Sequence, residues 1–67
     1  MLQFTDSTNY RHSIDTDKVS NVVIRPQNSD FVAAFHFGGT HVVAATVDKT
    51  TAEFIQTKLA DLKEPQQ

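Results

Sequence analysis

The chain has 67 residues, with 6 Lys and Arg against 8 Asp and Glu, a net charge of -2 and no cysteine. A chain this short forms one small domain with a limited core, and neither disulfides nor a thiolate metal site can reinforce it. The basic residues are scattered singly, which argues against a surface that follows a phosphate backbone. Because no apolar run reaches the ~18 residues of a membrane span, we expect a soluble, cytoplasmic protein that forms a single domain over residues 1–67.

Short strands are predicted in the polar N-terminal part. Apolar and polar residues alternate over residues 2–5, and a cluster of turn-forming residues follows at 6–9. The alternation returns over residues 10–14, which predicts a second short strand. A β-branched run from Val19 to Arg25 predicts a third strand, and it ends at residues 26–30, where Pro, Asn, Ser and Asp favour a turn.

The segment from Phe31 to Val47 is predicted to be a β-hairpin. Gly38 and Gly39 suit a two-residue loop of type I′ or II′, and this loop would place His36 opposite His41. Side chains alternate between the two faces of a strand. One face would then carry Phe31, Ala33, Phe35, Phe37, Val42 and Ala44. The other face would carry Val32, Ala34, His36, His41, Val43, Ala45 and Val47.

A helix is predicted after Val47. Asp48 or Thr50 can cap its start, and Thr50 with Glu53 fits the spacing of a capping box. Apolar residues recur at helical spacing and form one stripe, which predicts an amphipathic helix with one buried side. These residues are Ala52, Ile55, Leu59 and Leu62, with Phe54 beside them. The tail at residues 63–67 contains Pro65 and is expected to end the helix and fray.

The predicted fold class is α+β: an antiparallel β-meander of three to five strands with one C-terminal amphipathic helix packed on one face. Both faces of the hairpin are apolar, and a single helix about 10 Å wide covers only one of them. The sequence leaves open which face the helix covers. Either a second copy of the chain covers the other face, or the N-terminal strands fold back over it.

The histidines and acidic residues give no strong signal of chemistry. His36 and His41, if opposed, could share a metal ion or repel each other at low pH, but zinc sites need three or four protein ligands. Asp15 and Asp17 lack the remaining ligands of a calcium loop. We therefore predict no catalytic residue, no metal ligand and no cofactor.

The function expected from these observations is that of a small non-enzymatic protein-interaction or regulatory module, of the inhibitor or adaptor type. We expect a homodimer that also binds an unidentified protein partner. The candidate partner or dimer face is the one that carries Val32, Ala34, His36, His41, Val43, Ala45 and Val47, with the loops at residues 5–18 and 26–30 as further contact surface. The alternative is a protein that binds single-stranded nucleic acid by stacking bases on Tyr10, Phe35 or Phe37, which the acidic net charge makes less favourable.

Overall fold

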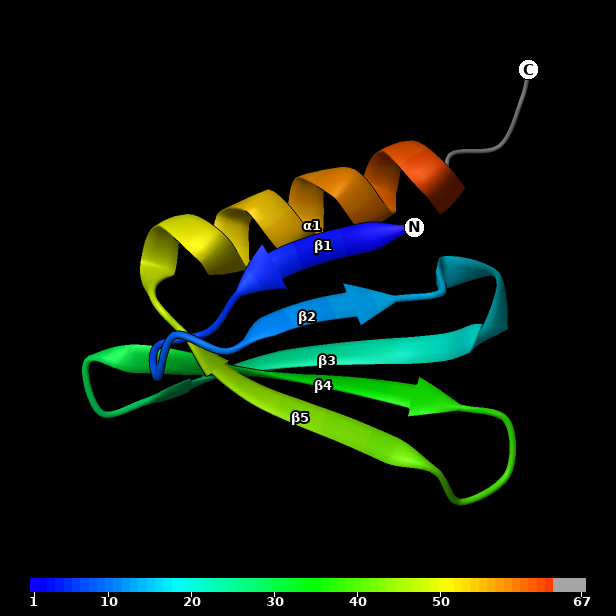
Figure 1. Cartoon of the computed structure of the whole chain (residues 1–67), viewed down its shortest axis with the longest axis horizontal. Coiled ribbons are helices and arrows are strands. Elements are labelled where there is room, and N and C mark those ends of the chain that lie inside the picture. Colours follow the sequence, from blue (N-terminus) through cyan, green and yellow to red (C-terminus); the bar gives the residue numbers. More distant parts are fainter. Residues whose placement is uncertain (64–67) are drawn as a thin grey trace.

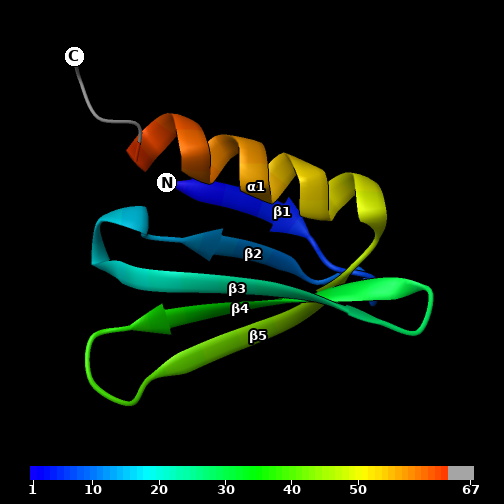
Figure 2. The same cartoon turned by 180° about the vertical axis from the view of Figure 1, so that it is seen from behind.

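The structure, a computed structural model, describes residues 1–63, and side chains as far as residue 60. It is an α+β fold of two antiparallel sheets and a C-terminal helix (Figures 1 and 2). The elements are β1 (Leu2–Thr5), β2 (Arg11–Ile14), the short 3-10 helix η1 (Thr16–Lys18), β3 (Val19–Gln27), β4 (Asp30–Phe37), β5 (Val42–Val47) and α1 (Lys49–Lys63). The predicted fold class is confirmed at this level. Residues 64–67, where most of the predicted frayed tail lies, are outside the described residues.

The five strands divide into a hairpin and a three-stranded meander. Strands β1 and β2 form one sheet, and β3, β4 and β5 form the other in sequence order. The turn between β3 and β4 consists of Asn28 and Ser29, and Asn28 adopts a φ of 57°. Asn tolerates this left-handed backbone because its short polar side chain can bond locally. A turn within residues 26–30 thus connects two strands, as the sequence predicts, but it is confined to Asn28 and Ser29 because β3 continues to Gln27 and β4 begins at Asp30.

The register between β4 and β5 differs from the prediction by one residue. Phe37 N–H donates to the His41 carbonyl at 2.9 Å, so the loop is Gly38–Gly39–Thr40, with Gly39 at a φ of 81°. His36 therefore lies opposite Val42, not His41. A shift of one residue turns every side chain of a strand to the other face. The predicted grouping of the hairpin residues into two faces is consequently wrong for all of β5.

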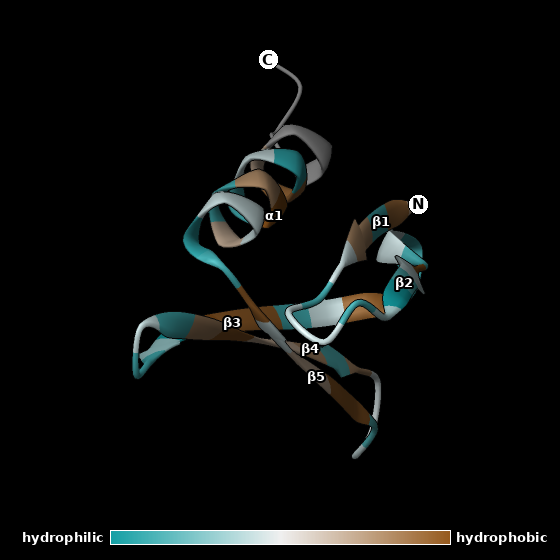
Figure 3. Cartoon of the chain, turned by 60° about the vertical axis from the view of Figure 1, so that its left-hand side comes forward, coloured by the Kyte–Doolittle hydropathy of each residue, from teal (hydrophilic) through white to brown (hydrophobic). Residues whose placement is uncertain are grey.

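The helix and the N-terminal hairpin both cover the face of the meander that carries the Phe residues. Figure 3 shows α1 and the β1–β2 hairpin on the same side of β3, β4 and β5. The alternative in which the N-terminal strands cover the opposite face is therefore wrong. The core unites apolar side chains from all of these elements. Its buried members are Leu2, Phe4, Ile14, Val19, Ala33, Phe35, Ala45, Val47, Ala52, Ile55 and Leu59.

Asp48 caps the start of the helix, and its carboxylate accepts a hydrogen bond from Thr51 N–H at 2.8 Å. This hydrogen bond satisfies one of the free amides of the first turn, and hydrogen bonding to Thr51 lowers the pKa of Asp48. Of the two predicted caps, Asp48 is the one in place. Ala52, Ile55 and Leu59 form the buried stripe as predicted, whereas Phe54 is 42% exposed. The side chain of Leu62 lies outside the described residues.

Candidate functional site

The face of the meander that points away from the helix is the main candidate site, and we call it the outer face. The strand registers and the alternation of side chains determine which residues lie on this face. Its residues are Asn21, Val23, Arg25 and Gln27 of β3, Asp30, Val32, Ala34 and His36 of β4, and Val42, Ala44 and Thr46 of β5. Within the part of the chain that the structure describes, no helix or strand lies on this side of the sheet (Figure 3).

The centre of the outer face is apolar. Val23 is 40% exposed and Val42 is 47% exposed. Val32 and Ala34 lie between their neighbours and are each 6% exposed, yet they do not belong to the core cluster. No other described helix or strand therefore packs on the apolar side chains of the outer face.

The ionisable residues of the outer face lie at its margin. Arg25 lies in the row of Val32 and Thr46, and His36 lies in the row at the other end. Next to that row, the Ser20 hydroxyl donates to the His36 carbonyl at 3.1 Å, beside the register irregularity between Val19 and Asn21. Asp30 adds a carboxylate in the row beyond Arg25, where it pairs with Gln27. A binding surface of this kind combines an apolar centre with a polar rim.

The structure separates the seven residues predicted to form a partner face. Val32, Ala34 and His36 do lie together on the outer face, but Val43, Ala45 and Val47 point toward the core, and Ala45 and Val47 are buried there. His41 lies outside β5, in the connection to it. The sequence analysis missed three exposed members of the outer face: Val23, Val42 and Ala44. A three-residue loop that includes Thr40 would have placed Val42 and Ala44 correctly, whereas the position of Val23 depends on the pairing of β3 with β4.

The histidine pair also differs from the prediction. The His41 ring lies 5.5 Å from the Phe37 ring, at the end of the hairpin, while His36 faces Val42 across the ladder. The geometric basis for a metal site shared by the two imidazoles is therefore wrong. Among the side chains that the structure describes, no three His, Asp or Glu residues are grouped so as to hold a metal ion. Asp15 accepts a hydrogen bond from Asp17 N–H at the start of η1.

A second polar site lies at the β1–β2 turn. One carboxylate oxygen of Asp6 accepts from Thr8 N–H at 2.9 Å, from the Thr8 hydroxyl at 2.8 Å and from Tyr10 N–H at 2.9 Å. The other oxygen lies 2.8 Å from His12 Nε2. The His12 ring stacks on Phe4 at 4.9 Å, and Phe4 stacks on Phe35 at 5.7 Å. The pair thus fixes a turn above the core. Among the described side chains, no Ser or Thr hydroxyl forms a hydrogen bond with His12 that would make it a nucleophile.

The Asp6 contacts predict a loss of stability in acid. The hydrogen bond from His12 lowers the pKa of Asp6 below its usual value of 3.8, and the contacts to Tyr10 and Thr8 add to this. A lowered pKa contributes stability that is present above the unfolded-state value and is lost as the pH falls below it. We expect the free energy of unfolding, from urea titrations between pH 6 and pH 2, to fall below about pH 4, and Asp6→Asn to flatten this fall.

Asp17→Asn, which changes an exposed carboxylate in η1, is the matched control and should retain the wild-type pH profile. If Asp6→Asn retained the full acid-dependent loss as well, Asp6 would not be its source.

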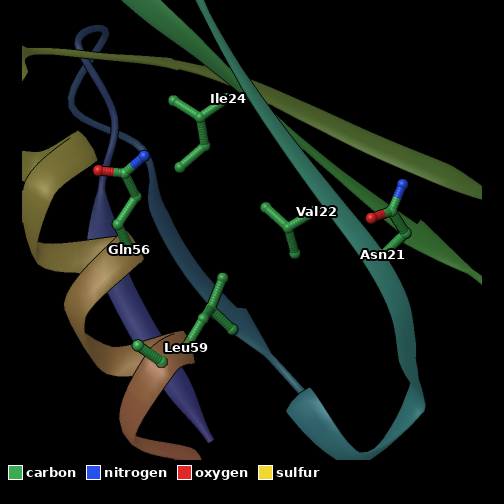
Figure 4. Close-up of a pocket in the computed structure, with 6 residues that line it drawn as sticks. Asn21, Val22, Ile24, Gln56 and Leu59 are labelled. Atoms are coloured by element: carbon green, nitrogen blue, oxygen red, sulfur yellow. The ribbon is translucent and has the colours of Figure 1, made fainter. Parts of the chain in front are cut away.

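An open groove lies between α1 and β3, with a volume of about 410 Å³. Val22 and Ile24 point from β3 toward Gln56 and Leu59 of the helix, whereas the side chain of Asn21 points away from them (Figure 4). Ala60 completes the lining. The groove exists because Val22 and Ile24 belong to the core face of an edge strand and are only partly covered by the helix.

Comparisons with known proteins add no identification: no protein-family model, curated protein or solved structure matches the chain. Within the described residues, no helix is both long enough and apolar enough to cross a membrane.

Proposed function

We propose that the protein is a small non-enzymatic, regulatory protein-binding module that forms a homodimer and binds a protein partner through its outer face. The observation that carries the proposal is the uncovered apolar centre of that face. A monomer seldom leaves a contiguous apolar patch in water without a function for it. The proposal includes the cytoplasmic location expected from the sequence.

The size of the outer face supports a role in association. From strand spacings of about 4.8 Å and a two-residue repeat of about 6.8 Å, its eleven positions span on the order of 300–400 Å². A stable protein–protein interface buries about 800 Å² on each partner. One copy of the outer face is therefore too small to serve as a complete stable interface, and self-association would enlarge it.

The nucleic-acid alternative has less support. Binding of single strands depends on exposed rings that stack on the bases. Phe31, Phe35 and Phe37 all lie on the core side of β4, and Phe35 is completely buried. The outer face carries His36 as its only ring and Arg25 as its only Lys or Arg. These side chains suit an apolar protein surface better than a series of stacked bases.

The outer face is tested with a matched pair of substitutions. Val23 and Phe54 are exposed to nearly the same extent, 40% and 42%, but Val23 lies on the outer face and Phe54 on the helix. We expect immobilised wild-type protein and Phe54→Glu to retain the same proteins from a lysate of the source cells. Val23→Glu should retain at least tenfold less of these proteins, because a carboxylate at the apolar contact would have to be desolvated.

Circular dichroism must show that both variants keep the wild-type fold. Retention of the same proteins by wild type and Val23→Glu, or their loss with Phe54→Glu alone, would contradict the proposed face.

A further inference from the structure

We propose that two copies of the chain associate through the outer edge of β5, so that two three-stranded sheets join as one six-stranded antiparallel sheet. This inference rests on the proposed self-association and specifies its geometry. Strand β5 is at one end of the strand order, and Figures 1 and 2 agree that no described element lies alongside most of its outer edge. The edge therefore presents backbone groups that a further strand can pair with.

The hydrogen-bond pattern identifies these backbone groups. Phe37 N–H donates to the His41 carbonyl, so these two residues form a hydrogen-bonded pair of the antiparallel ladder. Such pairs alternate along the ladder, so the backbone amides and carbonyls of Val43, Ala45 and Val47 point toward β4. The amides and carbonyls of Val42, Ala44 and Thr46 must then point outward. One observed contact agrees with this assignment: Ser7 N–H donates to the Thr46 carbonyl at 2.8 Å. Within the described residues, the outward donors and acceptors of Val42 and Ala44 have no hydrogen-bond partner.

The two edges of the meander differ in their protection against pairing. On β3, Pro26 has no N–H, Arg25 brings a charge, and the register is irregular near Ser20. Such features discourage strand addition. On β5 the sequence Val42–Val47 contains no charge, no Pro and no bulge. Val42 is 47% exposed and Ala44 is exposed as well. The edge that lacks protection is thus β5.

The occupied carbonyl of Thr46 selects one register. A two-fold pairing centred on Ala44 would place Thr46 opposite the partner's Val42 and compete with Ser7. A pairing centred on Val43 uses only the free groups: Val42 pairs with the partner's Ala44, and Ala44 with the partner's Val42. The two Val43 side chains then face each other as a non-hydrogen-bonded pair, with Cβ atoms about 5 Å apart. A second copy satisfies this symmetric pattern without any other sequence.

This pairing also enlarges the surface proposed for the protein partner. Val42 and Ala44 lie on the outer face, so the two outer faces become continuous across the dimer axis. Their combined extent would be on the order of 600–800 Å², twice the value for one copy. The edge pairing therefore brings the outer face closer to the about 800 Å² of a stable interface.

A single cysteine tests the register. The chain contains no cysteine, so Val43→Cys introduces one thiol, placed close enough to its counterpart for a disulfide if Val43 lies on the axis. We expect mild oxidation to convert most of the Val43→Cys protein to a covalent dimer. Val23→Cys, at an exposed position on β3, is the control and should form at least tenfold less dimer in the same time. Equal crosslinking of the two variants would overturn the register.

A second variant tests the edge itself. Ala44→Pro removes an outward N–H that the β4–β5 ladder does not use, so the meander should retain its fold, just as β3 accommodates Pro26. By light scattering at about 100 μM, we expect wild type at twice the chain mass of 7.5 kDa and folded Ala44→Pro at 7.5 kDa. If Ala44→Pro failed to fold, the comparison of crosslinking between Val43→Cys and Val23→Cys would still test the edge pairing.

The two proposals fail in different ways. A wild-type dimer that Ala44→Pro leaves intact, with no preferential crosslinking through Val43→Cys, would overturn the edge pairing and leave self-association standing. Wild-type protein that stays monomeric even at about 1 mM would overturn both the edge pairing and the homodimer. Loss of the partner on Val23→Glu, with the dimer retained, is expected if both proposals hold.

Discussion

Replacing Ala45 by glutamate is expected to unfold the protein, whereas the same replacement at Ala34 should leave it folded. Ala45 lies on the core face, is 5% exposed and belongs to the core cluster. A carboxylate there loses its hydration without gaining a partner, which costs several kcal/mol. A domain of this size has a free energy of unfolding of about 3–10 kcal/mol, so the substitution removes most or all of it.

Ala34 is the informative comparison because it has a similar exposure, 6%, and lies on the outer face of the neighbouring strand. A glutamate there can extend past Val23 and Ala44 into water, and we expect a loss of about 1–2 kcal/mol. Far-UV circular dichroism and urea unfolding measure both variants. The reverse result, a folded Ala45→Glu and an unfolded Ala34→Glu, would mean that the helix covers the other face.

Truncating Phe35 to alanine should cost about 3–5 kcal/mol. Phe35 has no exposed surface, lies in the middle strand and stacks on Phe4 at 5.7 Å. Its removal leaves a cavity that joins the meander, the N-terminal hairpin and the helix, and the surrounding side chains can close it only partly. The urea midpoint, measured at equal protein concentration, should fall accordingly.

Phe54→Ala provides the control, because it removes the same side chain from a position that is 42% exposed. We expect a change within about 1 kcal/mol. If Phe35→Ala is too unstable to measure, Phe35→Leu retains most of the volume and should lose about 1–1.5 kcal/mol. Equal losses for Phe35→Ala and Phe54→Ala would show that the ring of Phe35 does not form the centre of the core.

The elements could be predicted from the sequence because each depends on local patterns. Alternation identifies β1 and β2, the β-branched run identifies β3, and the helical spacing of Ala52, Ile55 and Leu59 identifies α1. Asp48, which caps the helix, was one of two residues that the sequence allowed in this role. These features are decided within a few residues of the chain, where propensity and side-chain periodicity have their effect.

The faces of the hairpin could not be predicted reliably, because a single loop residue reverses them. Gly38–Gly39 suits a two-residue loop, but the chain uses Thr40 as well and places Gly39 in the left-handed region. The energetic reason lies at the other end of β5. This register turns Ala45 and Val47 toward Ala33 and the helix, and burying a larger apolar area outweighs the preference of the turn.

The pair of Asp6 and His12 was beyond the sequence for a different reason. The two residues lie six positions apart and meet because the turn reverses the chain between them, with Asn9 at a φ of 75°. Their contact depends on that backbone geometry and on the Phe4 ring beneath His12. The outer face could not be predicted for a similar reason. It is defined by which elements pack on the opposite side of the sheet, and no local sequence pattern indicates this.

The packing of β1 against α1 has a consequence for the order of folding. The first strand of the chain shares its core with Ile55 and Leu59 of the last helix. The meander can form from sequential hairpins as the chain emerges during synthesis, since its contacts are local. The part of its Phe face that the helix covers, however, stays in water until the helix has been made. Until then the nascent chain exposes this part of the Phe face together with the outer face, and Ala52, Ile55 and Leu59 of α1 bury it afterwards.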